Sequence, residues 1–396
     1  MTAPAATVSA ERDETFLRRA FRLAMTGRGR VEPNPMVGCV LVRDGRIIGE
    51  GYHTHWGGPH AEPTALADCA ARGEGPAGAT AYVTLEPCCH TNKKTPPCAP
   101  RLIAAKVVRV VIGCLDPNPA VNGNGVAMLR AAGIRVDGPV LEAEAKQLIS
   151  PFLKSQGSGR PYVTMKWAET ADGKVAGPGG RRMQISNPAA SRLVHQLRAR
   201  SDGIVVGIGT VLADDPLLTA RGVEAARPLR RFVLDTHLRS PPDSQLVRTA
   251  RTVPLVVSAS PAARNDPARA GRVAELRAAG VKFLDDDDGV DGRINLREFL
   301  GSLIGDVYHL LAEPGPTLAR SLFPWADRLW VFRSPRRADD DTAPAAAPIP
   351  AGYAETGRLD VEGDTLTEYL NRSGEAFHTT VPSADFVLAT EDRMTE

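Results

Sequence analysis

The chain has 396 residues, which is too long for one ordinary hydrophobic core and favours two or three domains. Basic and acidic residues nearly balance, giving a formal net charge of +2, so composition offers no electrostatic argument for binding nucleic acid or an anionic membrane. The stretch Met1 to Glu14 carries charges where a signal peptide would need an apolar core, and no apolar run reaches the roughly 18 residues of a membrane span. We therefore expect a cytoplasmic protein whose partner is a small molecule rather than nucleic acid or membrane, and the sequence leaves a homo-oligomer open.

The cysteines are distributed unevenly along the chain. All six lie between Cys39 and Cys114, and the long remainder has none. A disulfide framework would spread over the protein, whereas a local cluster in a reducing compartment is typical of a metal site. The first third of the sequence is therefore the expected location of metal chemistry.

Helices and strands alternate in the first part of the chain. Apolar residues recur at helical spacing from Thr15 to Gly27, and Asp44-Gly45 is a strong hairpin signal between two apolar runs. In chain order we predict a helix over 15–27, strands over 36–42 and 46–52, a helix over 60–72, a strand over 79–85, a helix over 99–105, a strand over 107–112, a helix over 126–132 and a short strand over 134–136. This order predicts a three-layer α/β/α domain.

A second domain is predicted after a change in composition. The stretch Ser155 to Pro161 is rich in Ser, Gly and Pro and marks the expected boundary, giving domains over 1–154 and 161–396. Beyond it we predict strands over 162–168, 203–206, 231–234, 254–258, 281–284, 308–312 and 328–332, and helices over 188–200, 272–279, 296–304 and 317–323. This pattern indicates a doubly wound α/β domain. The part over 331–396 is the least defined, because no element is predicted over 334–352 and only one or two strands are expected over 368–388.

The residues that carry chemistry concentrate at His60-Ala61-Glu62, Pro87-Cys88 and Pro97-Cys98. Hydrolytic zinc deaminases use H-x-E followed by a Pro-Cys step and a second Cys, although here the second Cys lies further along than in C-x-x-C. His60, Cys88 and Cys98 can hold Zn²⁺ with the fourth position open for water, and Glu62, left off the metal, can transfer protons. These residues predict the hydrolytic removal of an amine from a ring carbon.

Two neighbouring side chains leave an alternative open. Cys89 or His90 could supply a fourth protein ligand, which would make the zinc site structural rather than catalytic. Glu62 speaks against this alternative, because a structural site does not need an unliganded carboxylate two residues from a ligand. Asn34 and His53, near the predicted hairpin, are placed to meet a pyrimidine edge, but a turn for Asn34 and a surface or core contact for His53 explain them nearly as well.

Two loops of the second domain are candidates for binding a ligand. Gly207-Ile208-Gly209-Thr210 follows a predicted strand, and its glycines would let the backbone approach a ligand closely. The third glycine of the dinucleotide fingerprint G-x-G-x-x-G is missing, so the loop is weak support by itself. The loop Glu313 to Thr317 enters a predicted helix, where either an anion site or a plain helix cap accounts for its residues.

An ordered series of short motifs resembles the bifunctional riboflavin-biosynthesis deaminase/reductase family. In the first domain these are Pro33-Asn34-Pro35-Met36-Val37-Gly38, Gly51-Tyr52-His53, Pro59-His60-Ala61-Glu62, Thr84-Leu85-Glu86-Pro87-Cys88, Thr95-Pro96-Pro97-Cys98 and Asp116-Pro117-Asn118-Pro119. In the second they are Asp172-Gly173-Lys174, Leu197-Arg198-Ala199, Thr210 to Pro216, Leu218-Thr219-Ala220-Arg221 and Gly315-Pro316-Thr317-Leu318. The resemblance covers roughly Thr15 to Trp330 and implies a cytidine-deaminase-like domain followed by a dihydrofolate-reductase-like domain.

The resemblance also implies roles for particular residues. In the first domain it implies that His60, Cys88 and Cys98 bind Zn²⁺ and that Glu62 is the proton donor. In the second it implies NADPH contacts by Ala168, Thr210, Asp214, Thr236, Gly315, Pro316, Thr317 and Leu318, and substrate contacts by Lys166, Arg198, Leu218, Arg221 and Glu313. The implied substrate is a phosphorylated pyrimidine, which is deaminated and whose ribosyl ring is then reduced to a ribityl chain.

The chain departs from the family's pattern in three places. The loop from Cys88 to Cys98 is one residue longer than the usual form. Arg182-Met183-Gln184 stands where the reductase usually has Ser-x-Trp, and the family's strand and loop with proline and glycine are not found past Trp330. These departures leave open a deaminase whose second domain no longer reduces its substrate. An RNA-editing deaminase is a rival of another class, which the balanced charge and the few aromatic residues disfavour.

Overall fold

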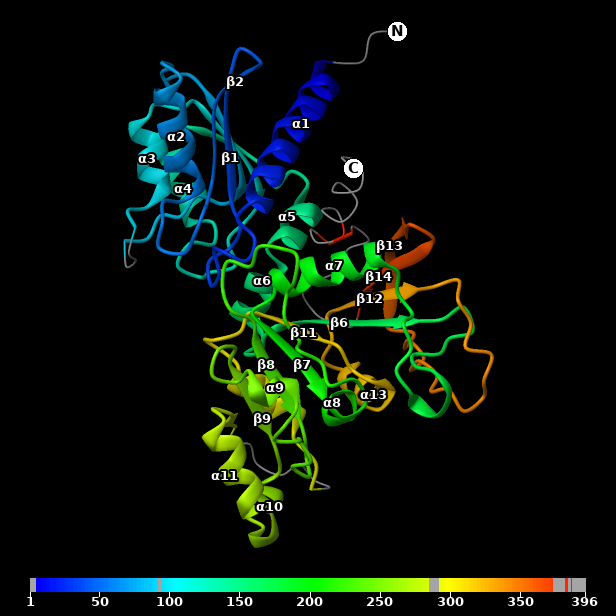
Figure 1. Cartoon of the computed structure of the whole chain (residues 1–396). Helices are drawn as coiled ribbons and strands as arrows, with labels where there is room; N and C mark the ends of the chain where they lie inside the picture. The colour runs from blue at the N-terminus through cyan, green and yellow to red at the C-terminus, as the bar shows by residue number, and fades with distance from the viewer. Residues whose placement is uncertain (1–4, 92–94, 285–291, 373–381, 384–385, 387–396) are drawn as a thin grey trace. The chain divides into compact units, whose positions relative to one another are not determined.

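The computed structural model describes residues 5–91, 95–284, 292–372, 382–383 and 386 (Figure 1). The chain forms two compact units with their boundary between Gly157 and Ser158, inside the Ser-, Gly- and Pro-rich stretch. Of the described residues, unit 1 contains those up to Gly157 together with 382–383 and 386, and unit 2 contains those from Ser158 to Arg372. Among the helices of the described residues, none has both the length and the apolar character that crossing a membrane requires.

Unit 1 is built on one mixed sheet. Within the described residues the sheet has five strands in the order β2-β1-β3-β4-β5, with β1 antiparallel to β2 and β3, and β3, β4 and β5 parallel. Asp44 and Gly45 both have positive φ, 52° and 74°, as the tight turn predicted between β1 and β2 requires. The strands are β1 (Gly38–Arg43), β2 (Arg46–Tyr52), β3 (Thr80–Leu85), β4 (Arg109–Cys114) and β5 (Arg135–Asp137).

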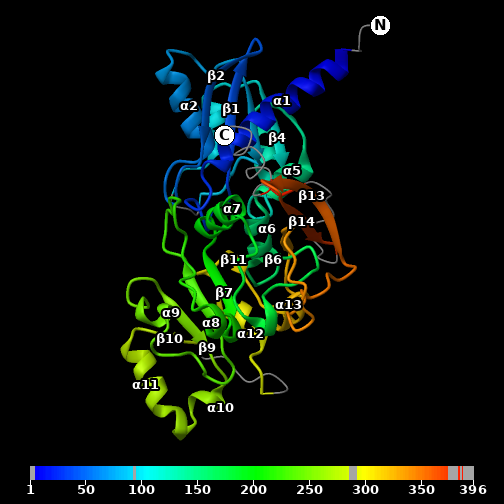
Figure 2. The same cartoon turned by 45° about the vertical axis from the view of Figure 1, so that its right-hand side comes forward.

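Helices cover both faces of this sheet, as Figures 1 and 2 show for α2 and α1 on either side of β1 and β2. Alternate strand residues point to opposite faces, so Leu41 and Val83 join one apolar cluster while Val40 and Val111 join the other. The first cluster packs against α2 (Ala61–Ala71), α3 (Cys98–Ala104) and α4 (Asn124–Ala131). The second packs against α1 (Ala5–Met25), α5 (Glu142–Leu148) and α6 (Ser150–Gly157). The predicted three layers are therefore present.

Unit 2 contains a longer sheet. In the described residues its nine strands are ordered β10-β9-β8-β7-β11-β6-β12-β14-β13, parallel from β10 to β12, after which β14 and β13 add an antiparallel hairpin. The strands are β6 (Tyr162–Glu169), β7 (Gly203–Gly207), β8 (Arg230–Leu234), β9 (Leu255–Ser258), β10 (Lys282–Phe283), β11 (His309–Ala312), β12 (Arg328–Arg333), β13 (Tyr353–Val361) and β14 (Asp364–Asn371). Parallel strands place their carboxyl ends along one edge, where α/β sheets bind ligands.

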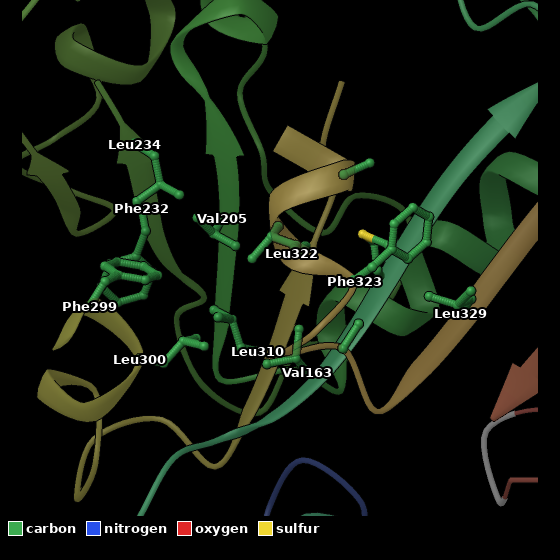
Figure 3. Packing of buried hydrophobic residues seen from close by; sticks show 14 of the residues in the cluster. Val163, Val205, Phe232, Leu234, Phe299, Leu300, Leu310, Leu322, Phe323 and Leu329 are labelled. Atoms are coloured by element: carbon green, nitrogen blue, oxygen red, sulfur yellow. The ribbon is translucent and has the colours of Figure 1, made fainter. Parts of the chain in front are cut away.

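The main core of unit 2 lies between the sheet and two helices (Figure 3). Phe299 of α12 meets Phe232 of β8 edge to face, with ring centroids 5.9 Å apart, and Leu322 of α13 packs in the same cluster. The helices of unit 2 are α7 (Pro188–Ala199), α8 (Ile208–Asp214), α9 (Gln245–Arg248), α10 (Pro261–Arg264), α11 (Ala270–Ala278), α12 (Leu296–Ser302) and α13 (Pro316–Leu322), with short 3₁₀ turns at Pro178–Gly180 and Pro267–Arg269.

The structure corrects several expected elements. Helix α1 starts at Ala5 rather than Thr15, and the short helices α5, α6, α8, α9 and α10 were not predicted. The antiparallel strands β13 and β14 occupy 353–371, whereas we expected strands over 368–388, a range that lies largely outside the described residues. β13 is an edge strand with only Val361 buried, so its sequence lacks the alternating apolar pattern that marks a half-buried strand.

Candidate active sites

The three predicted zinc ligands come together in unit 1. The ligand atoms of His60, Cys88 and Cys98 all lie within 4.8 Å of one another. His60 Nδ1 is 3.7 Å from Cys88 Sγ and 3.5 Å from Cys98 Sγ. Ligands held about 2.0–2.3 Å from a tetrahedral zinc ion would be roughly 3.5–3.8 Å apart, so both distances from His60 to the sulfurs match a zinc site.

Local hydrogen bonds explain how two cysteines so far apart in sequence meet. Cys98 opens helix α3, and the N–H groups of Cys98 and Ala99 donate to the Cys88 carbonyl at 3.0 and 3.1 Å. The Cys98 N–H also lies 3.4 Å from Cys88 Sγ. The intervening loop is thus closed at its base, whatever its length. Residues 92–94 of the longer loop lie outside the described residues.

The two thiols need a cation to ionise together. The hydrogen bond with Cys88 and then burial raise the pKa of the Cys98 thiol far above its usual value. A thiolate is the form that binds a metal, and a dication between the two sulfurs is the kind of partner that would stabilise both negative charges. The chemistry of this ligand set therefore agrees with its geometry.

The imidazole of His60 is oriented by a residue that we did not predict. His60 precedes helix α2, and its Nε2 lies 3.2 Å from Thr95 Oγ1 while its Nδ1 faces the two sulfurs. When Nε2–H donates to the Thr95 hydroxyl, the lone pair of Nδ1 is left for a metal. Thr95 belongs to the motif Thr95-Pro96-Pro97-Cys98, so its proximity to the site could have been suspected from the sequence.

Glu62 is buried beside the ligand cluster. It lies in the first turn of α2 with 3% of its surface exposed, and its Oε2 atom has no hydrogen-bond partner among the described residues. Burial raises the pKa of this carboxyl group above its usual value, and the nearby Cys88 adds to the effect. A buried carboxyl group with an unused oxygen and a raised pKa is suited to exchanging protons.

The cavity beside Glu62 has a volume of about 350 Å³ and is lined in part by Asn34 and His53. His53 Nδ1 lies 2.8 Å from the Pro59 carbonyl and Nε2 lies 3.1 Å from Asn34 Nδ2, so Nδ1–H donates and Nε2 accepts. Burial lowers the pKa of His53, which favours this neutral form. Asn34 keeps its Oδ1 and a second N–H for a ligand.

Asp116 and Asn118 also line this cavity, although we had not predicted them as site residues. They follow strand β4 in a turn that Glu86 fixes by accepting hydrogen bonds from the N–H groups of Asp116, Gly123 and Val126. Polar residues at the carboxyl end of a buried strand are the signal that could have identified them.

The alternative fourth ligands are not part of the cluster. Within the described part of the chain, neither Cys89 nor His90 joins the group of ligand atoms. Cys89 Sγ lies 3.8 Å from the Ala120 carbonyl, and His90 lines the cavity. The geometry therefore favours three protein ligands and an open fourth position.

A second cavity, of about 900 Å³, lies at the carboxyl ends of the unit 2 strands. It is lined by all the residues that the family resemblance implied for unit 2 except Leu218, which is buried and has a φ of 52°. A Cβ atom added at Gly209 or Gly315 would meet nothing within 4 Å, so the backbone is open to a ligand at both positions. The lining is Lys166, Ala168, Arg198, Thr210, Asp214, Arg221, Thr236, Glu313, Gly315, Pro316, Thr317 and Leu318, with further residues from 175–186.

Glu313 forms a partly buried ion pair with Arg198 in this cavity. Arg198 Nε and Nη2 donate to the two carboxylate oxygens at 2.7 and 2.8 Å. Burial alone would raise the pKa of Glu313, but Arg198 and Lys166 outweigh it and lower the pKa to about 2. Burial lowers the pKa of Lys166. Glu313 is therefore ionised and fixed, with Arg198 and Lys166 oriented around it.

Comparison with known proteins follows this division. The cytidine and deoxycytidylate deaminase zinc-binding region matches residues 10–114, and the RibD C-terminal domain matches residues 161–326. The riboflavin biosynthesis protein RibD of Aquifex aeolicus is 38% identical over 82% of this chain and 88% of its own length. The chain belongs to the RibD family.

Other RibD proteins agree with this assignment. RibD of Escherichia coli is 47% identical over 58% of this chain and 61% of its own length. A deaminase/reductase from Thermotoga maritima has a solved structure that covers 92% of this chain and 99% of its own, with a TM-score of 0.78 and 32% identity. Form 1 of Acinetobacter baumannii RibD gives a TM-score of 0.76, with 91% and 99% covered and 32% identity. The predicted deaminase-like and reductase-like folds are confirmed.

Proposed function

We propose that this RibD-family chain catalyses two consecutive steps of riboflavin synthesis. Unit 1 removes an amine hydrolytically from 2,5-diamino-6-ribosylamino-4(3H)-pyrimidinone 5′-phosphate, and unit 2 reduces the ribosyl group of the product to a ribityl chain with NADPH. The carrying observation is the convergence of His60, Cys88 and Cys98 beside the unpartnered Glu62 carboxyl oxygen. The two family matches, one in each unit, support both activities in one chain.

In unit 1 the protein would orient the pyrimidine and move protons. His60, Cys88 and Cys98 would hold zinc, which supplies Lewis-acid activation of a water molecule when it is bound. Glu62 is placed to accept a proton from that water and to deliver it to the departing amine. Asn34, held by His53, and Asp116 and Asn118 offer donors and acceptors along the cavity wall for the pyrimidine edge.

In unit 2 the main contribution is positioning. Hydride transfer between a nicotinamide and a sugar carbon needs the two groups aligned more than it needs a strong acid. Ala168, Thr210, Asp214, Thr236 and the loop over 315–318 are the proposed NADPH contacts, with backbone open at Gly209 and Gly315. Lys166, Arg198, Arg221 and Glu313 are the proposed substrate contacts. Leu218 is buried and does not line the cavity, so a direct substrate contact is not proposed for it.

The zinc-loaded protein tests this proposal directly. With the diaminopyrimidine phosphate alone, we expect ammonia release without further change. With NADPH added, we expect oxidation of NADPH that starts only as deaminated product accumulates. Ammonia release without NADPH oxidation or NADPH binding would leave a deaminase only. If both activities persist after zinc is removed, the proposed zinc-dependent hydrolytic site is wrong.

The proposed partners are small molecules rather than nucleic acid. The near balance of basic and acidic residues gives no compositional argument for binding a nucleic-acid phosphate backbone. Tight, salt-sensitive binding of tRNA would contradict this part of the proposal. Size-exclusion chromatography with light scattering would determine whether the chain forms a homo-oligomer.

A further inference from the structure

The large cavity of unit 2 carries a marked excess of positive charge. Its described lining includes six basic side chains and two carboxylates. The whole chain has a formal net charge of only +2, so the excess of basic over acidic side chains at this cavity is larger than that of the entire chain. A concave site with one sign of charge attracts ligands of the opposite sign. The basic residues are Lys166, Arg182, Arg198, Arg221, Arg239 and Arg293.

Three of these cations already have a structural or proposed task, whereas Arg182, Arg239 and Arg293 do not, and of these three Arg182 lies where the sequence departs from the reductase pattern. Lys166 and Arg198 surround the ionised Glu313, and Arg221 is a proposed substrate contact. Arg182 is an exposed cavity residue that makes no hydrogen bond or ion pair within the part of the chain that the structure describes. Its charge acts on Asp214 across the cavity, where it opposes the rise in the pKa of that carboxyl group caused by burial.

The backbone before Arg182 is a compact turn that directs the side chain. The Gly177 N–H donates to the Arg181 carbonyl at 2.8 Å, and the Gly180 N–H donates to the Gly177 carbonyl at 3.0 Å. Arg181 is extended, with φ −67° and ψ 147°, so Arg181 and Arg182 point in different directions. Arg181 Nε bonds the Pro178 carbonyl and does not line the cavity, whereas Arg182 does.

A second segment holds the same loop from its other side. Arg336 Nη1 donates to the Gln184 carbonyl at 2.8 Å, and Thr342 Oγ1 accepts from the Gly179 N–H at 3.0 Å. The Val175 N–H donates to the Pro344 carbonyl at 2.9 Å, and Pro344 itself lines the cavity. The segment 334–347, in which no element was predicted, is therefore an ordered wall that supports the loop on both sides of Arg182. A supported loop reduces the entropy lost when a side chain binds a ligand.

We propose that Arg182 is a phosphate-binding residue of the unit 2 cavity, at a position where the reductase pattern usually has serine. This inference rests on the proposed reductase function, because both ligands of that reaction carry phosphate groups. A guanidinium group can donate two parallel hydrogen bonds to a phosphate and adds a full charge, whereas serine donates one neutral hydrogen bond. The phosphate belongs either to NADPH or to the pyrimidine substrate, and the two sources are separable by experiment.

Binding measurements on the full-length, zinc-loaded protein test the role of Arg182. The variants are Arg182→Ser, Arg182→Gln and Arg182→Lys, with Arg181→Ser as the matched control that removes a neighbouring charge outside the cavity. Isothermal titration calorimetry gives Kd for NADPH, for NADH, which lacks the 2′-phosphate, and for the deaminated pyrimidine with and without its 5′-phosphate. Ammonia release by unit 1 and the melting temperature identify any variant that has lost its fold. The affinities of the remaining variants then test whether Arg182 binds phosphate.

We expect Arg182→Ser and Arg182→Gln to raise Kd for a phosphate-bearing ligand by about tenfold or more. Arg182→Lys should lose less, because it keeps the charge, and Arg181→Ser should stay within about twofold of the wild type. A loss confined to NADPH assigns the 2′-phosphate, a loss shared with NADH assigns the pyrophosphate, and a loss confined to the 5′-phosphorylated pyrimidine assigns the substrate. Wild-type affinity for all these ligands in the neutral variants would overturn the role of Arg182 alone. A wild-type protein that binds none of them would overturn the proposed reductase function as well.

Discussion

Glu62 is buried and Glu313 is partly buried, one in each cavity, and their surroundings affect them in opposite ways. Burial raises the pKa of Glu62, whose Oε2 has no hydrogen-bond partner among the described residues. Glu313 is held by Arg198 through two hydrogen bonds, and its pKa is lowered to about 2. The same residue type is therefore poised to exchange a proton in unit 1 and fixed as an anion in unit 2.

The cavities around these two residues differ accordingly. The unit 1 cavity, of about 350 Å³, sits beside one tight set of ligand atoms. The unit 2 cavity, of about 900 Å³, runs along the ends of several strands, and its charged lining residues are mainly basic, with backbone open at Gly209 and Gly315. A hydrolytic centre thus depends on a few groups placed closely together, whereas a site for a dinucleotide and a substrate depends on a wide, positively charged surface.

The largest effect is expected from removing a proposed zinc ligand. Cys98→Ser should abolish zinc binding and ammonia release and lower the melting temperature of unit 1, because a bound structural or catalytic ion stabilises the fold that holds it. NADPH oxidation with deaminated substrate should persist. Metal analysis and the two activity assays on one protein sample measure these outcomes.

Cys89→Ser is the matched control for that variant. It removes a neighbouring thiol that is outside the ligand cluster, so zinc content and deamination should stay near wild-type values. Equal loss of zinc in both variants would mean that Cys89 closes the fourth position, and the unit 1 site would then be structural.

The next effect concerns Glu62 itself. Glu62→Gln keeps the size of the side chain but cannot carry a proton, so deamination should fall by about 10²–10⁴-fold while zinc content is unchanged. Glu74→Gln, at a carboxylate that pairs with Arg43 and Arg46 outside the cavity, is the control and should retain activity. Wild-type deamination by the Glu62→Gln variant would mean that Glu62 does not exchange protons, and the proposed contrast with the fixed anion Glu313 would be wrong.

The deaminase centre was far more accessible from the sequence than the reductase cavity. His60, Glu62, Cys88 and Cys98 lie at helix starts and after a strand, where a few short motifs determine their placement. Thr95, Asp116 and Asn118 were missed because single polar residues in loops carry no periodic signal. All three nevertheless belong to the motifs that carry the family resemblance, so those motifs could have indicated that they lie at the site.

The segment after β12 shows what sequence patterns cannot reveal. The part over 334–347 is held by contacts between main-chain groups and polar side chains, including Asp172, which accepts from the N–H groups of Ala338 and Asp339 at 3.1 Å each. Such contacts join positions more than 150 residues apart and leave no apolar repeat. A segment in which no helix or strand is predicted can therefore form part of a cavity wall.

A smaller effect, with a defined pH dependence, is expected for Glu313→Gln. At neutral pH the lowered pKa of Glu313, about 2 against an ordinary 4.5, corresponds to a contribution of about 3 kcal/mol to the free energy of unfolding. The folded-state pKa lies below the unfolded one, so this contribution is complete above pH 4.5 and is lost as pH falls toward about 2. The difference in stability between wild type and variant should shrink over that window in chemical unfolding experiments.

Activity and a control sharpen the same test. Glu313→Gln should weaken reduction by about tenfold or more, since Arg198 and Lys166 lose the anion that orients them, and should leave ammonia release unchanged. Glu355→Gln removes an exposed pair with Arg358 in the same unit and should change stability by less than about 1 kcal/mol. A stability difference that persists unchanged at pH 2 would contradict the assigned ionisation.

The smallest effect concerns the helix that carries Arg198. Asn187 caps α7 by accepting from the Ala190 N–H at 2.8 Å, and its Nδ2 donates to the carbonyls of Val361 and Glu362 at 2.6 and 3.1 Å. Asn187→Ala should therefore cost about 1–2 kcal/mol in urea unfolding. Asn187→Asp keeps a capping oxygen but loses both donors, so its free energy of unfolding should lie between those of the wild type and Asn187→Ala.

Asn295→Ala, at a cap of α12 with no such link to the β13–β14 turn, is the control and should cost only the usual ~1 kcal/mol. Equal losses for Asn187→Ala and Asn295→Ala would mean that the turn adds nothing to the position of α7, and that Arg198 is held by its own helix, Glu313 and the Thr219 carbonyl without help from the turn.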